Sequence, residues 1–166
     1  MAGQNSSKGS VKSGAKSSRG DKKIIATNRS ARYEYSVEDT YEAGMVLTGT
    51  EVKSLRQGHA VINDGFLVIK DDEAWLHQIN IPQYSHGNRE NHEPVRKRKL
   101  LLSAREIHKI NQKLTRQGFT AFPLELYFKG AWVKVLIGLG KGKKLYDKRQ
   151  TEKERSARRE LRDRDY

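Results

Sequence analysis

Apolar and polar residues alternate along several short stretches of the chain, which is the pattern of β-strands that bury one face. The two longest stretches predict a hairpin with Lys129 and Gly130 at its turn. One face of this hairpin is apolar, and the other carries Tyr127, Trp132 and Lys134. In chain order, strands are predicted at residues 33–37, 45–47, 61–62, 66–69, 74–77, 100–102, 119–128 and 131–138.

Two helices are predicted between the strands. Thr48 and Glu51 have the spacing of a capping box, and a helix of two to three turns follows them. Ser103 and Glu106 repeat the signal, and apolar residues at spacings of three and four continue toward Gly118. The pattern predicts a mainly β (α+β) fold with two or three short helices. Because closure removes exposed sheet edges, we expect a small antiparallel OB-like β-barrel.

A long polar segment at residues 80–98 interrupts the alternation, and loops of this length are usually functional or mobile. His86 and His92 lie in it, but no cysteine or third histidine completes a metal-binding set. We therefore favour loop polarity or RNA contact over a metal. Glu51 and Asp64 could be imagined as a catalytic carboxylate pair. A helix cap explains Glu51 more simply, and a turn explains Asp64.

The glycine-rich run at residues 138–142 has some likeness to a phosphate-binding loop. However, Lys143 stands where a dinucleotide motif needs its third glycine, and no helix clearly follows. A flexible hinge between the last strand and the C-terminal tail is the simpler interpretation. Motifs of hydrolases, metalloproteases and nucleotide-binding loops are missing from the sequence, so we expect no catalytic residues, no cofactor and no metal.

Charge separates the chain into three parts. The formal net charge is +13, and residues 1–23 contain six Lys/Arg and one Asp/Glu, while residues 141–166 contain eleven and six. We predict a disordered basic extension at 1–22, one folded domain at 23–142 and a basic tail at 143–166. Such a charge points to nucleic acid or an anionic membrane. Nucleic acid is favoured because no apolar run approaches the roughly 18 residues of a membrane span, and the zero cysteines fit a reducing cytoplasm.

Two further features favour RNA. The run Arg96-Lys-Arg-Lys99 directly precedes a predicted strand and places cations at one lip of the sheet. Aromatic rings can stack on bases, although each ring taken singly is more simply explained as core. The candidate rings are Tyr33, Tyr35, Tyr41, Tyr84, Tyr127 and Trp132.

Four motifs occur in a characteristic order. They are Asn28-Arg-Ser-Ala-Arg32 followed by Tyr-Glu-Ala-Gly44, then Gly49-Thr-Glu-Val-Lys-Ser-Leu-Arg56, then Gly87-Asn-x-x-Asn-His-x-Pro94 with its basic and leucine-rich continuation, and Gly142-Lys-Lys-x-Tyr-Asp-Lys-Arg149. In these motifs, from about Lys23 to Arg149, the chain resembles the SmpB (small protein B) family. Residues 1–22 fall outside the resemblance.

The resemblance implies an RNA-binding adaptor of trans-translation rather than an enzyme. Such an adaptor holds the tRNA-like domain of transfer-messenger RNA (tmRNA) and reaches stalled ribosomes together with elongation factor Tu. Its barrel stands in for the missing anticodon arm, and its tail enters the empty message channel at the decoding centre of the small subunit. We expect a monomer when free. The rival interpretation is a general basic ribosomal or rRNA-binding OB protein.

The implied residues fall into two groups. Family contacts with RNA map to Asn28, Glu42, Leu101 and Lys134, and the neighbouring motifs and the basic run add Arg29, Arg32, Arg96, Arg98 and Lys99. The hinge and the decoding-centre tail map to Gly142, Lys143, Lys144, Tyr146, Asp147, Lys148 and Arg149. Tyr146 departs from the histidine of other members, but either ring can stack on a base. Glu42 would either accept from base amino groups or orient neighbouring cations.

The tail has almost no apolar stripe, since its aliphatic residues from Gln150 onward are Ala157 and Leu161. Favourable Glu–Arg pairs at spacing four are opposed by Arg–Arg pairs, so the segment cannot overcome helix nucleation in water. We predict that residues 143–166 are disordered in the free protein. On the ribosome, a helix from about Thr151 becomes possible as the arginines are neutralised.

Overall fold

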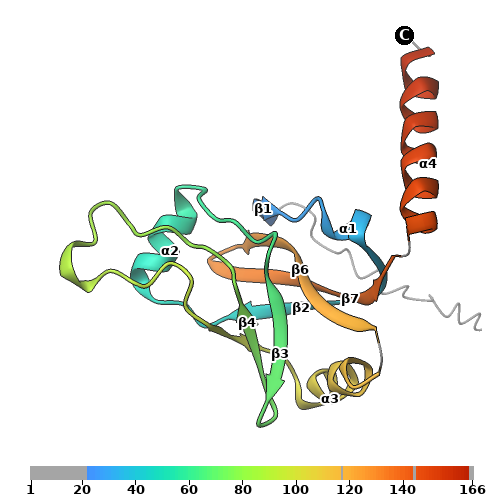
Figure 1. Cartoon of the computed structure of the whole chain (residues 1–166). Helices are drawn as coiled ribbons and strands as arrows, with labels where there is room; N and C mark the ends of the chain where they lie inside the picture. The colour runs from blue at the N-terminus through green and yellow to red at the C-terminus, as the bar shows by residue number, and fades with distance from the viewer. Residues whose placement is uncertain (1–21, 117, 144, 165–166) are drawn as a thin grey trace, which may run out of the picture.

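The structure is a computed structural model that describes residues 22–116, 118–143 and 145–164 (Figure 1). The predicted extension at residues 1–22 lies outside this part of the chain except for Lys22, which begins the first strand. The elements are β1 (Lys22–Thr27), α1 (Ala31–Glu34), β2 (Tyr35–Met45), α2 (Gly49–Arg56), β3 (Phe66–Lys70), β4 (Glu73–His77), a 3-10 turn (Asn88–Glu90), β5 (Arg98–Leu101), α3 (Ala104–Leu114), β6 (Phe119–Lys129), β7 (Trp132–Gly142) and α4 (Leu145–Arg164).

The seven strands form one sheet in the order β1-β6-β7-β2-β5-β4-β3, and every neighbouring pair is antiparallel. The predicted mainly antiparallel fold with several helices is therefore confirmed. The sheet is not closed into a barrel: among the described strands, β1 pairs only with β6, and β3 only with β4. Strand β3 instead crosses β6 and contacts it (Figure 1), so packing encloses the core without a continuous hydrogen-bonded ladder.

The predicted hairpin is the centre of the core. Its apolar face is buried as expected, with Leu126, Val135 and Ile137 at 0% exposure. Tyr127 was predicted on the polar face and lies there, yet it is also buried. Strand β1 pairs with β6 beside it, and the Lys22 ammonium lies 4.3 Å from the centre of the Tyr127 ring.

The helix start signals are confirmed. Thr48 and Ser103 both form complete capping boxes, with Glu51 and Glu106 as the returning carboxylates. Satisfying the free amide groups of the first turn in this way stabilises a short helix. Helix α3 ends at Leu114, ahead of Gly118, whose φ of +85° suits glycine.

Three strand predictions were incomplete. Strand β1 was missed because KKIIAT does not alternate clearly, and residues 31–34, expected partly as strand, form α1. Strand β2 was predicted only at its two ends. Its middle is rich in polar residues, because both faces of the strand are partly open to solvent there.

The glycine-rich run is not the expected hinge, because residues 138–142 continue β7. A Cβ atom on Gly140 would lie 2.1 Å from the Ser36 carbonyl oxygen, and one on Gly138 would meet the Phe122 ring at 2.9 Å. These glycines let neighbouring strands approach closely.

Helix α4 extends away from the sheet and touches the rest of the protein near α1 (Figure 1). It begins at Leu145. The helix from about Thr151 on the ribosome stays a prediction. That the tail is disordered in the free protein stays a prediction. No helix of the described residues is long and apolar enough to cross a membrane.

Candidate nucleic-acid interface

Five residues form a row across the outer face of the sheet. The strand registers place Ile24 opposite Tyr127, Tyr127 opposite Lys134, Lys134 opposite Gly44, and Gly44 opposite Leu101. A Cβ atom on Gly44 would lie 3.5 Å from Leu101 Cβ and 3.7 Å from Lys134 Nζ. The structure therefore brings Leu101 and Lys134, 33 positions apart in the sequence, onto one patch.

This outer face combines exposed apolar groups with cations. Leu101 and Ile24 are 58% and 54% exposed, and Trp132 near the hairpin tip is 74% exposed. Lys134 and Lys129 lie on the same face of the hairpin. Exposed rings and aliphatic groups contact bases, while ammonium groups contact phosphates. The face has the chemistry that a folded RNA requires.

Glu42 orients its neighbours on this face. Its carboxylate accepts a short hydrogen bond from the Tyr127 hydroxyl, and its other oxygen accepts one from Lys129 Nζ at 3.3 Å. The Tyr127 hydrogen bond is the main cause that lowers the pKa of Glu42. Burial, followed by that same hydrogen bond, raises the pKa of Tyr127. Glu42 is thus a charged acceptor with both oxygens engaged, which favours the orienting role.

Asn28 is also a positioning residue. It is only 4% exposed, and its amide donates to the Pro123 carbonyl at 2.9 Å. Its Oδ1 accepts from the Ala31 amide at 3.1 Å and from the Ser30 hydroxyl at 3.0 Å. These bonds fix the start of α1 and hence the flanking arginines. Arg29 and Arg32 are exposed.

Arg98 lies in the interior and does not reach the surface. Its side chain is 0% exposed and pairs with Glu51, which is also 0% exposed. It donates to the Ile79, Arg96 and Pro94 carbonyls at 3.0–3.1 Å. The alternation along β5 turns Arg98 inward and Leu101 outward. In this conformation Arg98 cannot touch RNA, so the sequence-based prediction of an RNA contact is corrected to a structural role.

Arg96 is held by the same acid. Its Nε donates to Glu51 Oε1 at 2.8 Å, and its side chain remains 30% exposed. Burial alone would raise the pKa of Glu51, but hydrogen bonds from Arg98, Arg96 and the Thr48 amide together lower it. The pattern that predicted Glu51 as a helix cap was right, but a spacing of 45 and 47 residues gave no sign of the two ion pairs.

The loop at 80–98 is ordered by its own polar side chains. Asn91 accepts from the Tyr84 amide at 3.1 Å and donates to the Tyr84 carbonyl at 2.6 Å. A Cβ atom on Gly87 would lie 2.6 Å from Asn91 Nδ2. The buried His92 ring bonds Thr50 at 2.9 Å and the Ile81 carbonyl at 2.7 Å. This motif therefore builds a loop, and the described residues contain no His/Asp/Glu group suited to a metal.

The remaining predicted residues lie on β5, at the end of β7 and in the tail. Lys99 pairs with Glu73 at 3.1 Å. Gly142 ends β7, and a Cβ there would meet nothing within 4 Å. Lys143 donates to the Arg32 carbonyl at 3.0 Å. Lys144 and the side chains of Tyr146 and Asp147 lie outside the described residues, while Lys148 and Arg149 belong to the first turns of α4.

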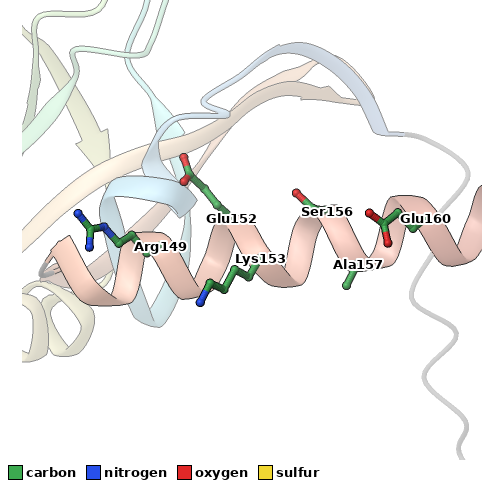
Figure 2. A pocket seen from close by; sticks show the side chains of 6 residues that line it. All are labelled: Arg149, Glu152, Lys153, Ser156, Ala157 and Glu160. Atoms are coloured by element: carbon green, nitrogen blue, oxygen red, sulfur yellow. The ribbon is translucent and has the colours of Figure 1, made fainter.

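A shallow hollow also runs along α4, but it offers no site. Figure 2 shows that its labelled side chains all come from this one helix, from Arg149 to Glu160. Glu152 and Lys153 project to opposite sides of the helix in this view. All residues that line this hollow belong to α4, so no second element encloses it in the part of the chain that the structure describes.

Sequence reasoning missed Gly44 and Ile24 as parts of the outer face. Gly44 stood inside a recognised motif, but its role depends on the neighbours supplied by β5 and β7. Ile24 belongs to the strand that was not predicted. No local pattern would have revealed either contact, since both depend on pairing between distant strands.

The chain is similar to known proteins over most of its length. The profile of the family described as SmpB protein matches residues 25–165. An SsrA-binding protein of Rhizorhabdus wittichii is 55% identical over 148 residues, which cover 86% of this chain and 92% of that protein. An SsrA-binding protein of Streptomyces avermitilis is 56% identical over 141 residues, which cover 85% and 80% of the two chains.

A solved structure described as "tmRNA-SmpB: a journey to the center of the bacterial ribosome" contains a chain with 43% identity and a TM-score of 0.62, covering 81% of this chain and 94% of that one. The curled antiparallel sheet, the lysine-bearing outer face and the basic terminal helix define a small protein suited to bind a polyanion. Together with the sequence match, they identify the particular kind: the chain belongs to the SmpB protein family.

Proposed function

We propose that this chain binds tmRNA and acts with it in trans-translation on the ribosome. The observation that carries the proposal is the family match over residues 25–165, together with relatives named SsrA-binding protein and a similar chain described with tmRNA. Its role is that of a cytoplasmic RNA-binding adaptor and not of an enzyme. Elongation factor Tu joins it during delivery, and the free protein is a monomer.

The outer face of the sheet holds the tRNA-like domain of tmRNA. Leu101 and the backbone at Gly44, which lies between Leu101 and Lys134, contact the RNA surface, and Lys134 contacts its phosphates. Glu42 holds Lys129 and Tyr127 in place. The curled sheet presents this face as an OB-like fold does, and recognition depends on shape and backbone more than on base identity.

The tail acts separately at the decoding centre. Gly142 permits the turn out of β7, and Lys143 follows it directly in the chain. We propose, from the family motif, that Tyr146 to Arg149 contact small-subunit rRNA in the empty message channel. The exposure of the helix supports this division, because Leu161 is 64% exposed and nothing in the described chain buries it.

Capture of RNA from a bacterial lysate tests the proposal. We expect one dominant RNA with a tRNA-like end to be recovered with the wild-type chain and to be lost with Leu101→Glu, which places a carboxylate on the outer face. Val95→Glu is the matched control, since Val95 is also exposed and lines a hollow that contains none of the five residues of the row. Recovery of mixed ribosomal RNA would instead support a general rRNA-binding protein.

A paired assay tests the separation of body and tail. Truncation after Leu145 is expected to leave binding of tmRNA nearly intact in a gel shift and to abolish tagging of a stalled nascent chain. Replacing Asp147, Lys148 and Arg149 with alanine is expected to have the same two effects. Loss of both activities, or of neither, would contradict the division.

A further inference from the structure

Four arginines meet in a hollow between the sheet body (residues 22–142) and α4. Arg29 lies just before α1 and Arg32 within it, while Arg155 and Arg159 come from α4. The hollow has a volume of about 330 Å³. All four side chains are exposed. No local pattern predicts this meeting, because more than 120 positions separate the two pairs.

The four guanidinium groups carry uncompensated charge. None of them forms an ion pair with a carboxylate in the part of the chain that the structure describes. The one acid at the hollow, Glu125, is already paired with Lys22 Nζ at 2.7 Å. Arginines that share a hollow repel one another until an anion arrives. A multiply charged anionic ligand would relieve this repulsion.

Other contacts bring the two walls together. The Tyr33 hydroxyl donates to Glu152 Oε1 at 2.9 Å, which ties α1 to α4. Lys143 donates from its amide to the Glu34 carbonyl at 2.8 Å and from Nζ to the Arg32 carbonyl at 3.0 Å. Asn28 fixes the beginning of α1 through its hydrogen bonds to Ser30 and Ala31. The arginine arrangement is thus built by groups that are not themselves part of the charge cluster.

We infer that this hollow is a binding site for the sugar–phosphate backbone of an RNA strand, completed when α4 docks on α1. Guanidinium groups bind phosphate oxygens through paired, charge-assisted hydrogen bonds, and several arginines suit consecutive phosphates. Binding there neutralises the repulsion and stabilises the docked helix, so that tail folding and RNA binding are linked. The inference rests on the proposed function, since that function brings the chain to RNA.

Two RNAs offer the same backbone chemistry, and binding at varied salt separates them. The probes are purified tmRNA and purified ribosomes stalled on a truncated message. The test variant is Arg155→Gln with Arg159→Gln in the full chain. The matched control is Lys153→Gln with Arg158→Gln, which removes the same charge from the same helix at residues that do not line the hollow. Figure 2 shows Lys153 on the side of α4 opposite to Glu152.

The affinity falls as salt rises, and each lost phosphate contact makes the slope of log affinity against log salt shallower by about 0.7–0.9. Because loss of the tail is expected to leave tmRNA binding nearly intact, we expect the test variant to make the slope shallower by about 1.4–1.8 with the ribosomes, and the control to change it much less. The RNA that shows the loss is the ligand of the hollow. Equal slopes for the test variant and the wild type with both probes, or an equal loss in the control, would overturn the inference.

Failure of the proposed function has a different signature, because the wild-type chain itself would then fail to bind tmRNA. Tyr33→Phe adds a check of the hollow's construction. It removes the hydrogen bond to Glu152 without changing charge, so we expect it to weaken binding of the same RNA in the wild-type background. In the Arg155→Gln, Arg159→Gln background it should have no further effect. Additive effects would show that Tyr33 does not act through the hollow and would contradict the arrangement.

Discussion

The sheet body and α4 differ in what stabilises each of them. In the body, Ile79, Leu126 and Ile137 are completely buried, as are the charged partners Glu51 and Arg98. In α4, none of the side chains that the structure describes is buried. Burial of its own side chains stabilises the body, whereas α4 buries almost none of its side chains.

This difference shows how one chain can provide both a fixed surface and a conditional one. An i,i+4 pair such as Glu154 and Arg158 adds only about 0.2–0.5 kcal/mol to a helix. Like-charged pairs such as Arg155 and Arg159 subtract a similar amount. The body can therefore present the outer face at all times, while α4 depends on contacts with α1 and on an anionic partner.

The largest expected effect falls on the buried ion pair of the body. Glu51→Gln leaves Arg98 buried without a counter-charge, and loss of one partner of such a pair costs about 3–5 kcal/mol. We expect a correspondingly lower free energy of unfolding in urea. Glu73→Gln is the control, since Glu73 forms an exposed pair with Lys99, for which about 0–1 kcal/mol is expected. Equal losses in the two variants would contradict the role of burial.

Acid should weaken the body through the same residue. Because the pKa of Glu51 is lower in the folded state than its ordinary value of 4.5, its contribution to stability is complete above that value. It is lost as pH falls through the lower folded-state pKa. Unfolding in urea at pH 7 and at successively lower pH should show a smaller loss for Glu51→Gln than for the wild type. Parallel curves would show that Glu51 does not carry this dependence.

The next effect concerns the close approach of β2 and β7. Gly140→Ala places a Cβ atom 2.1 Å from the Ser36 carbonyl oxygen, so the strands must move apart. Forced overpacking of this kind typically costs about 1–3 kcal/mol, and thermal melting measures it. Gly142→Ala is the matched control, because a Cβ atom there meets nothing within 4 Å. A variant of Gly140 that melts like the control would contradict the description of β7.

Local patterns predicted the two capped helices and the β6–β7 hairpin because their signals lie within a few residues of one another. They failed where distant strands decide the outcome. Arg98 was expected to bind RNA because it sits in a basic run, but the alternation of β5 and the presence of Glu51 place it inside. Closure into a barrel was inferred from the need to cover edges, and the structure covers them partly by crossing β3 over β6.

The candidate site shows the same division. Family motifs identified Glu42, Leu101 and Lys134, but only the strand registers show that Gly44 lies between the last two. The hollow between α1 and α4 had no sequence signal, because it depends on where α4 docks. A pattern over a few residues reports which face a side chain takes, and the neighbours on that face come from tertiary structure.

A smaller effect is expected on the outer face, without a change in folding. Lys134→Ala removes an ammonium group beside Leu101, and we expect tmRNA binding to weaken by about 1–2 kcal/mol, the size of a charge-assisted hydrogen bond. The melting temperature should stay close to that of the wild type. Lys109→Ala, at an exposed position on α3, is the control. A collapse of the fold in the Lys134 variant would mean that this residue is structural.

Amide hydrogen exchange of the free protein tests the contrast between body and tail most directly. Protection reports local opening, and a helix without buried contacts opens at little cost in free energy. We predict that amides of α4 exchange almost as fast as an unfolded chain, while those of β6 and β7 are protected up to the global free energy of unfolding. Protection of α4 equal to that of β7, in the absence of RNA, would contradict the account.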